Sequence, residues 1–197
     1  MSKFPITPFW RETPLTESEQ RLWDAVMQAH HESAMRQNMS HGAAVNAFVG
    51  SGSYAAAMAS AILTTGGMHA PIAETMEAIG AVMGNITDSS DERFVRGFTE
   101  SGEKIPGWGN SFFKGEPDAL WAGVDRVLAE SFSGIRGAIT RITHFLHIAG
   151  KNIYPNPSAF TAATALALGI PPVVAPFIFF QGRLAAWTQI VNQIHKP

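Results

Sequence analysis

The stretch AAVNAFVGSGSYAAAMASAILTTGGMHAPIAETME, residues 43–77, decides the fold. Its middle part, residues 55–61, is mostly alanine and serine, so a helix there has little side-chain bulk and lets another backbone come close. Gly66 and Gly67 end this thin helix, because glycine accepts backbone angles that other residues resist. Pro71 suits the first turn of a following helix, which we expect over residues 72–82.

His69 falls in the break between these two helices. Near free N–H groups and the positive end of a helix dipole, its ring is expected to stay neutral and to attract anions. A neutral imidazole can donate a hydrogen bond to a carbonyl oxygen, which suits it to enolising a thioester. The simpler interpretation is a polar capping residue in a turn.

Composition excludes several classes of function. The chain has 197 residues, 46% of them hydrophobic, a net charge of −2 and no cysteine. Scattered basic residues offer no surface for nucleic acid or anionic membrane, and disulfides, thiolate catalysis and zinc–thiolate sites are ruled out. The longest apolar run, residues 170–180, contains three prolines and is too short to span a bilayer. We therefore expect one soluble, cytoplasmic domain over residues 1–197.

Hydrophobic periodicity predicts an all-α chain. Thr16 and Glu19 form a capping-box pattern that opens a first helix, and residues 40–42 are predicted to be a break after which the thin helix begins. The adjacent histidines His30 and His31 point about 100° apart on a helix, so at most one of them faces a given pocket. No strand pattern is present, and we expect no metal site because no carboxylate stands beside the chain's other histidine pair, at positions 144 and 147.

A glycine-rich segment, GEKIPGWGNSFFKGE over residues 102–116, differs from the rest. Gly107 and Gly109 flank Trp108, an open backbone that is able to wrap a ligand. Trp108 or Phe112 would then cover a flat ring, and Lys114 would meet a phosphate. The alternative is a tight surface turn with a buried tryptophan.

Arg183 lies inside the apolar stretch FFQGRLAAWTQIV. An arginine in such surroundings either pairs with a carboxylate or binds an anionic ligand. The alternative is a side chain that extends along its stem to solvent.

Four segments, in order and with similar spacing, resemble the citrate synthase superfamily. They are GSGSYAAAMASAILTTGGMHAPIAET, IPGWGNSFFKGEPD, NIYPNPSAFTAATALALGIP and FFQGRLAAWTQIVNQ, and the resemblance covers roughly residues 20–193. It implies an all-helical citrate-synthase-like fold with a large, dimer-forming subdomain, residues 16–84 plus 157–197, and a small subdomain, residues 85–156. It also implies a homodimer or higher homo-oligomer, with coenzyme A over the glycine loop and acetyl-CoA and an oxo acid such as oxaloacetate as substrates. The citryl-CoA lyase module of ATP-citrate lyase runs related chemistry in reverse.

The resemblance assigns roles to individual residues. His69 matches the histidine that polarises the thioester carbonyl, and Arg183 matches an arginine that clamps the substrate carboxylate. Lys114 falls where family members place a basic residue for the coenzyme A phosphates. His31 with Glu32 corresponds to an early His-Glu pair of the family.

Three positions depart from the family pattern. Asn110 replaces the second catalytic histidine, and Ser158 replaces the aspartate that removes the methyl proton. Asp118 stands where an arginine would hold oxaloacetate, and we expect no second arginine from the partner's tail, since the sequence ends at Pro197.

These replacements predict weak or altered activity. Loss of a general base typically costs on the order of 10²–10⁴ in rate, and serine does not take that proton unaided. Asn110 can still donate a hydrogen bond to an oxyanion, and a carboxylate at position 118 would repel a dicarboxylate. Glu74 or His31 is the remaining candidate base. The alternative is a catalytically inactive homodimeric homologue with a binding, regulatory or structural role.

Overall fold

The structure is a computed structural model that describes residues 10–36, 39–64, 71–84, 87–109 and 115–194. Within these ranges the chain forms α-helices, one 3-10 turn and no strand, so the predicted all-α class is confirmed. The elements, in chain order, are α1 (Glu17–Met35), α2 (Met39–Ser51), α3 (Tyr54–Leu63), α4 (Ile72–Gly84), α5 (Asp88–Ser101), η2 (Ala119–Trp121), α6 (Ala122–Ser131), α7 (Ser133–Ile148), α8 (Pro157–Ala167) and α9 (Pro176–Ile194).

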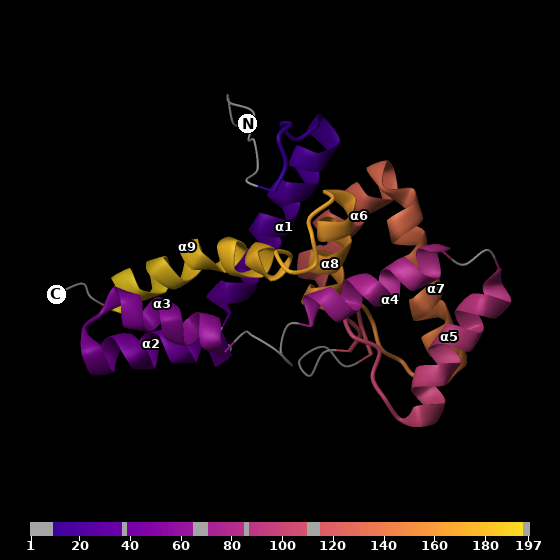
Figure 1. Cartoon of the computed structure of the whole chain (residues 1–197). Helices are drawn as coiled ribbons and strands as arrows, with labels where there is room; N and C mark the ends of the chain where they lie inside the picture. Colours follow the sequence, from indigo (N-terminus) through magenta and orange to yellow (C-terminus); the bar gives the residue numbers. More distant parts are fainter. Residues whose placement is uncertain (1–9, 37–38, 65–70, 85–86, 110–114, 195–197) are drawn as a thin grey trace.

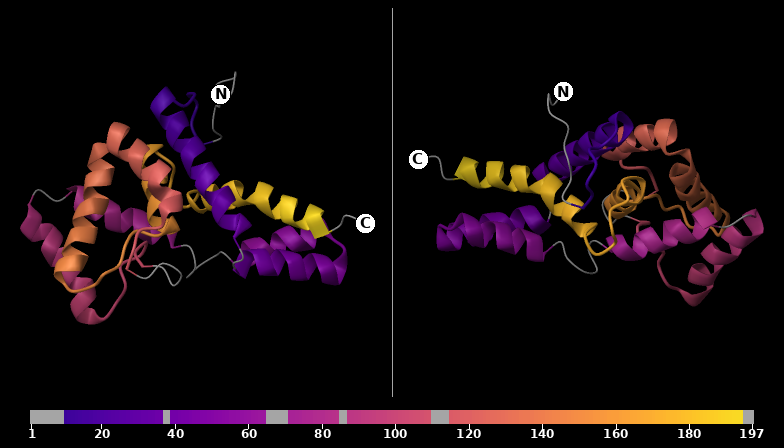
Figure 2. Two further views of the ribbon diagram at one scale, coloured as in Figure 1. Left: turned by 180° about the vertical axis from the view of Figure 1, so that it is seen from behind. Right: turned by 45° about the horizontal axis from the view of Figure 1, so that its top comes forward.

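The helices form two groups joined by the long helices α1 and α9. The α2–α3 hairpin lies along the C-terminal half of α9 and extends to one side, whereas α4 to α8 gather on the other (Figures 1 and 2). Each group has its own apolar core. One core contains Trp187 of α9 with Ala44 of α2 and with Ala57 and Ala61 of α3, and the larger one contains most of the remaining buried side chains.

Helices α1 and α9 belong to both cores, and this positions the candidate site. Ala29 of α1 and Phe179 of α9 pack in the larger core, whereas Ala34 and Ala186 pack in the smaller one. His30 and Arg183 therefore lie where the two cores meet. Gly182 permits the close approach of the two helices, because a Cβ there would stand 2.5 Å from the Cβ of His30.

The start of α1 follows the sequence prediction. Thr16 is the N-cap, the Glu19 amide donates to its hydroxyl, and the Glu19 carboxylate accepts from the Thr16 amide. Arg11 also donates to Glu19, and this lowers the pKa of the Glu19 carboxyl to about 2.

One helix boundary differs from the prediction. The break expected at residues 40–42 is wrong, because α2 runs through them and ends instead before Gly52, whose φ of 65° suits a residue without a Cβ. Helix α5 begins at Asp88 with Thr87 as its N-cap. Among the described residues, no helix is both long enough and apolar enough to cross a membrane.

Candidate functional site

Three of the predicted site residues, His69, Asn110 and Lys114, lie outside the described residues. Their roles stay predictions from the sequence. The structure does place the other candidates, and it brings Arg183 together with a histidine that the sequence analysis did not select.

That histidine is His30, which is fully buried between helices α1, α8 and α9. Its Nε2 lies 2.8 Å from the Thr161 hydroxyl oxygen, and the Arg183 Nε donates to its Nδ1 over 3.5 Å. The ring meets Trp121 and Phe179 edge to face, with centroid distances of 4.9 and 4.7 Å. Residues from three separate parts of the chain thus converge on one imidazole.

The hydrogen bonds determine which nitrogen of His30 carries the proton. The Thr161 hydroxyl donates its only hydrogen to the Pro157 carbonyl, 2.7 Å away, so it accepts from the Nε2–H of His30. Nδ1 is then unprotonated and accepts from Arg183. Burial, together with the Arg183 charge, holds the pKa of His30 well below its usual value, so the imidazole is neutral at pH 7.

Arg183 is also buried, with 6% of its surface exposed. Its Nη2 donates to the Ser33 hydroxyl over 3.1 Å, and its guanidinium carbon lies 4.0 Å from the centre of the Phe179 ring. No carboxylate of a described residue forms an ion pair with it, and burial lowers the pKa of Arg183 to about 10. The extension to solvent that the sequence left open is excluded for this side chain.

Ser158 lies at the start of helix α8, the helix that also carries Thr161. It is buried at the second position of the helix, where its amide donates to the Asn156 capping side chain, and it precedes Thr161 by one turn. A carboxylate at this position would face the positive end of the helix dipole. Ser158 supplies a hydroxyl at this position in place of a carboxylate.

His31, the histidine predicted to bind substrate, is only partly buried, while its neighbour His30 contacts Arg183. The sequence contains a signal that favours His30. Leu22, Val26, Ala29 and His30 follow the i, i+4, i+7, i+8 spacing of one helix face, and His31 falls beside it.

Gly107, Trp108 and Gly109 form a tight crossing with the segment before α8. The Gly109 amide donates to the Tyr154 carbonyl and the Asn156 amide to the Gly107 carbonyl, both at 2.9 Å. A Cβ at Gly107 would collide with Thr75, so this position requires glycine. The Trp108 indole is buried and donates to Thr143 over 2.9 Å, which matches the buried-tryptophan alternative. The Trp108 ring is therefore not exposed to cover a ligand, and the amides of Trp108 and Gly109 and the carbonyls of Gly107 and Gly109 already have partners within the protein.

Asp118 has two partners of its own. Its Oδ1 caps η2 by accepting from the Leu120 amide at 3.1 Å, and it accepts from Arg36 Nη1 at 3.5 Å. Asp118 is buried, whereas the Arg36 side chain is half exposed. Arg36 follows Ser33 by one turn, so α1 connects Asp118 to the Arg183 cluster.

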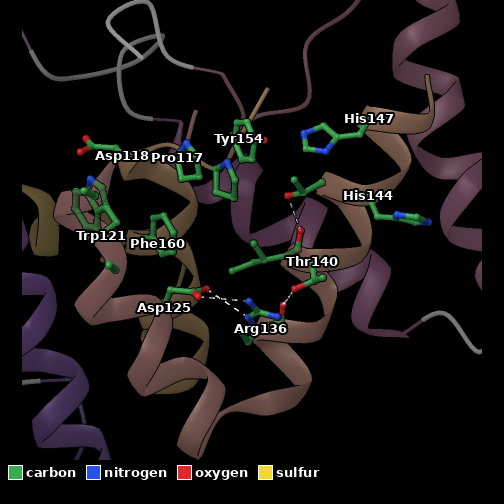
Figure 3. A pocket seen from close by; sticks show the side chains of 15 residues that line it. Pro117, Asp118, Trp121, Asp125, Arg136, Thr140, His144, His147, Tyr154 and Phe160 are labelled. Atoms are coloured by element: carbon green, nitrogen blue, oxygen red, sulfur yellow. Dashed lines mark hydrogen bonds and ion pairs between the residues drawn. The ribbon is translucent and has the colours of Figure 1, made fainter. Parts of the chain in front are cut away.

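A pocket of about 460 Å³ opens on the other side of Trp121, between helices α6, α7 and α8 (Figure 3). Asp125 and Arg136 point toward one another across it, and His144 and His147 lie along its α7 wall. Its lining combines aromatic rings with polar side chains, as ligand pockets do. Among the described residues, no three histidine or acidic side chains are grouped as metal ligands would be.

The fold matches known structures closely. The chain superposes on citryl-CoA lyase from Hydrogenobacter thermophilus with a TM-score of 0.78 and 20% identity, over 92% of this chain and 71% of that one. Citrate synthase from Thermotoga maritima gives a TM-score of 0.72 and 22% identity, over 90% of this chain and 49% of that one. Citrate synthase from Thermoplasma acidophilum, solved with carboxymethyl coenzyme A and oxaloacetate, gives 0.71 and 17%, over 93% and 50%.

These structures define the class: the chain has the all-α citrate synthase fold. It spans about half the length of the two citrate synthases and a larger share of the lyase. No protein-family model matches the chain, and no curated protein matches it by sequence.

Proposed function

We propose that this protein binds an acyl-CoA and an organic acid, and that it catalyses acetyl-CoA condensation with an oxo acid or citryl-CoA cleavage at a low or altered rate. The observation that carries this proposal is the Arg183 guanidinium, which is buried and has no carboxylate among the described residues. A buried charge without a counter-ion is costly, so an anionic ligand would be bound with a net gain.

The surroundings of Arg183 support the binding of a carboxylate. His30 and Ser33 hold the guanidinium in one orientation, and Phe179 covers one face of it. The same arginine matches the substrate clamp of the family that the sequence resembles. The fold neighbours include a citryl-CoA lyase and a citrate synthase solved with a coenzyme A derivative and oxaloacetate, which supports an acyl-CoA as the second ligand.

Each of the candidate residues has its own role in the proposed reaction. Arg183 binds the acid, His69 polarises the thioester carbonyl, and Asn110 donates to the developing oxyanion. Coenzyme A lies over the turn at residues 107–109, and Lys114 binds one of its phosphates. Ser158 lacks a carboxylate, so removal of the methyl proton is the slow step.

The first test is a measurement of thiol release from acetyl-CoA with a panel of 2-oxo acids, and separately of citryl-CoA cleavage. We expect slow turnover that falls at least tenfold in Arg183→Gln and in His69→Ala. Arg96→Gln is the matched control, because Arg96 is an exposed arginine on α5 whose ion pairs with described residues, Glu92 and Glu100, lie within the same helix. Equal rates in Arg183→Gln and the wild type would show that Arg183 does not belong to the active site.

Binding of coenzyme A is tested independently of turnover. Calorimetric titration should give an affinity that drops several-fold in Lys114→Ala, because one phosphate contact is lost. Coenzyme A binding without turnover on any acid would instead support an inactive homologue that binds the cofactor.

A further inference from the structure

The hydrogen bonds of the Arg183 guanidinium to described residues lie along one of its edges. Its Nε donates to His30 Nδ1 over 3.5 Å, and its Nη2 donates to the Ser33 hydroxyl over 3.1 Å. His30 and Ser33 are three residues apart on α1, so they lie on the same face of that helix. Because the Nε–H and one Nη2–H of a guanidinium point in the same direction, α1 occupies this edge of the fork.

The other edge of the guanidinium has no acceptor among the described residues. This edge is formed by Nη1 and by the second hydrogen of Nη2, and two parallel N–H groups of this kind match the two oxygens of a carboxylate. The acceptors on the first edge are a neutral imidazole and a hydroxyl, neither of which neutralises a positive charge. The charge of Arg183 therefore stays available to an anion at the second edge.

Thr161 determines whether His30 can accept from Arg183. The Thr161 hydroxyl donates to the Pro157 carbonyl over 2.7 Å and accepts from His30 Nε2 over 2.8 Å. A neutral imidazole carries one ring proton, so a proton held on Nε2 leaves Nδ1 as an acceptor. With the proton on Nδ1, two N–H groups would face each other and the Arg183 Nε–H would be left without a partner. Both His30 and Thr161 are completely buried, so solvent does not substitute for either of them.

We propose that His30 and Thr161 are positioning residues for Arg183, which together present its Nη1–Nη2 edge to one carboxylate of the acid. Thr161 fixes the tautomer of His30, and His30 fixes the guanidinium without neutralising it. This inference rests on the proposed function, because it assumes that Arg183 binds the acid. It makes acid affinity depend on two buried side chains that act through Arg183.

The test removes the hydroxyl that fixes the His30 tautomer. Thr161→Val keeps the size of the side chain, but Nε2 loses its acceptor and the ring proton can move to Nδ1. Calorimetric titration of the full chain with oxaloacetate and with 2-oxobutyrate should give dissociation constants at least tenfold higher in Thr161→Val, as expected for the loss of a hydrogen bond to a charged group. Thr161→Ser restores the hydroxyl and should bind within about threefold of the wild type.

Thr164 provides the matched control on the same helix. It is also completely buried, and its hydroxyl donates to the Phe160 carbonyl over 2.8 Å, the same bond to the preceding turn that Thr161 makes. It does not form a hydrogen bond with His30. Thr164→Val should therefore bind acids as the wild type does, and equal affinities in Thr161→Val and Thr164→Val would overturn the inference.

The tautomer of His30 is a readout that a loss of packing alone does not change. Nitrogen chemical shifts of the labelled histidine rings at pH 7 should show a protonated Nε2 and an unprotonated Nδ1 in the wild type, with the proton shifted toward Nδ1 in Thr161→Val. His30→Asn places an amide oxygen near the position of Nδ1, whereas His30→Gln places its amide near Nε2, so His30→Asn should retain more acid affinity. A wild-type His30 protonated on Nδ1, or a His30→Gln that binds better than His30→Asn, would overturn the inference.

Arg183→Gln separates this inference from the function on which it rests. If the wild type binds no acid, or if Arg183→Gln binds acids as well as the wild type does, the proposed acid site fails and the positioning role fails with it. If binding depends on Arg183 but is the same in Thr161→Val as in the wild type, the positioning role alone fails.

Discussion

The burial of His30 makes the stability of the protein depend on pH. In the folded state its imidazole is neutral, because burial and the charge of Arg183 lower its pKa well below 6.5. In the unfolded chain the same group takes up a proton below about pH 6.5, so protons bind preferentially to the unfolded state. The contribution of neutral His30 to the free energy of unfolding is complete above about pH 6.5 and is lost as the pH falls below this value.

We therefore expect the free energy of unfolding to decrease below pH 6.5 with a slope that approaches about 1.4 kcal/mol per pH unit from this one group. Urea unfolding at a series of pH values between 5 and 7.5 measures the slope. His30→Gln should reduce it, while His31→Gln, one position along the same helix, should leave it in place. If the slope is the same in His30→Gln and His31→Gln, His30 does not cause the pH dependence of stability.

Ser158 permits a gain-of-function test at the residue scale, on the assumption of the proposed function. Ser158→Asp would supply a carboxylate near the start of α8, where the helix dipole favours a negative charge. Because a positioned general base typically contributes on the order of 10²–10⁴ in rate, we expect at least a tenfold faster condensation. Ser158→Asn is the control of similar size, and equal rates in the two variants would contradict the role of position 158 as the site of the base.

The sequence predicted local features better than contacts between distant segments. The capping box at Thr16 and the all-α class are confirmed, because both depend on neighbouring residues or on helical periodicity. The apolar face of α1 favours His30 over its neighbour, but the contact of His30 with Arg183 depends on where Gly182 lets α9 approach, and the partner of Asp118 depends on where α1 ends. Such contacts leave at most a weak signal in a single sequence.

At the scale of elements, the crossing of α1 and α9 depends on Gly182. An alanine Cβ would stand 2.5 Å from the Cβ of His30, so the two helices would have to separate. We expect Gly182→Ala to lower the free energy of unfolding by about 1–3 kcal/mol, as overpacking of a core does. It should also weaken acid binding, because the contact between Arg183 and His30 spans this crossing.

Gly97 provides the matched control for this substitution. It lies in α5, and a Cβ there meets nothing within 4 Å. Gly97→Ala should therefore stabilise the protein by about 0.5–1 kcal/mol, because alanine loses less backbone entropy in a helix. Chemical denaturation of both variants measures the difference, and a Gly182→Ala protein as stable as the wild type would show that the helices are not in close contact.

At the scale of the whole molecule, the group formed by α2, α3 and α9 exposes large apolar side chains. Val49 at the end of α2 is 69% exposed, and Leu63 at the end of α3 is 81% exposed. Tyr54, Leu184 and Ile194 of the same group are also exposed. The thin helix α3 has mostly small side chains, which allow another backbone to pack closely, and exposed apolar surface of this kind often marks an interface between proteins.

We expect this surface to hold two copies of the chain together, in agreement with the dimer implied by the sequence resemblance. Light scattering coupled to size-exclusion chromatography should give a dimer mass for the wild type and a monomer mass for the double variant Val49→Glu, Leu63→Glu. Ile148 is 63% exposed at the end of α7, in the other group of helices, so Ile148→Glu should stay dimeric. Two charges buried in an apolar interface cost several kcal/mol, but only where that interface exists. A wild-type monomer at micromolar concentration would therefore exclude the dimer. Equal dissociation caused by Ile148→Glu would place the contact elsewhere.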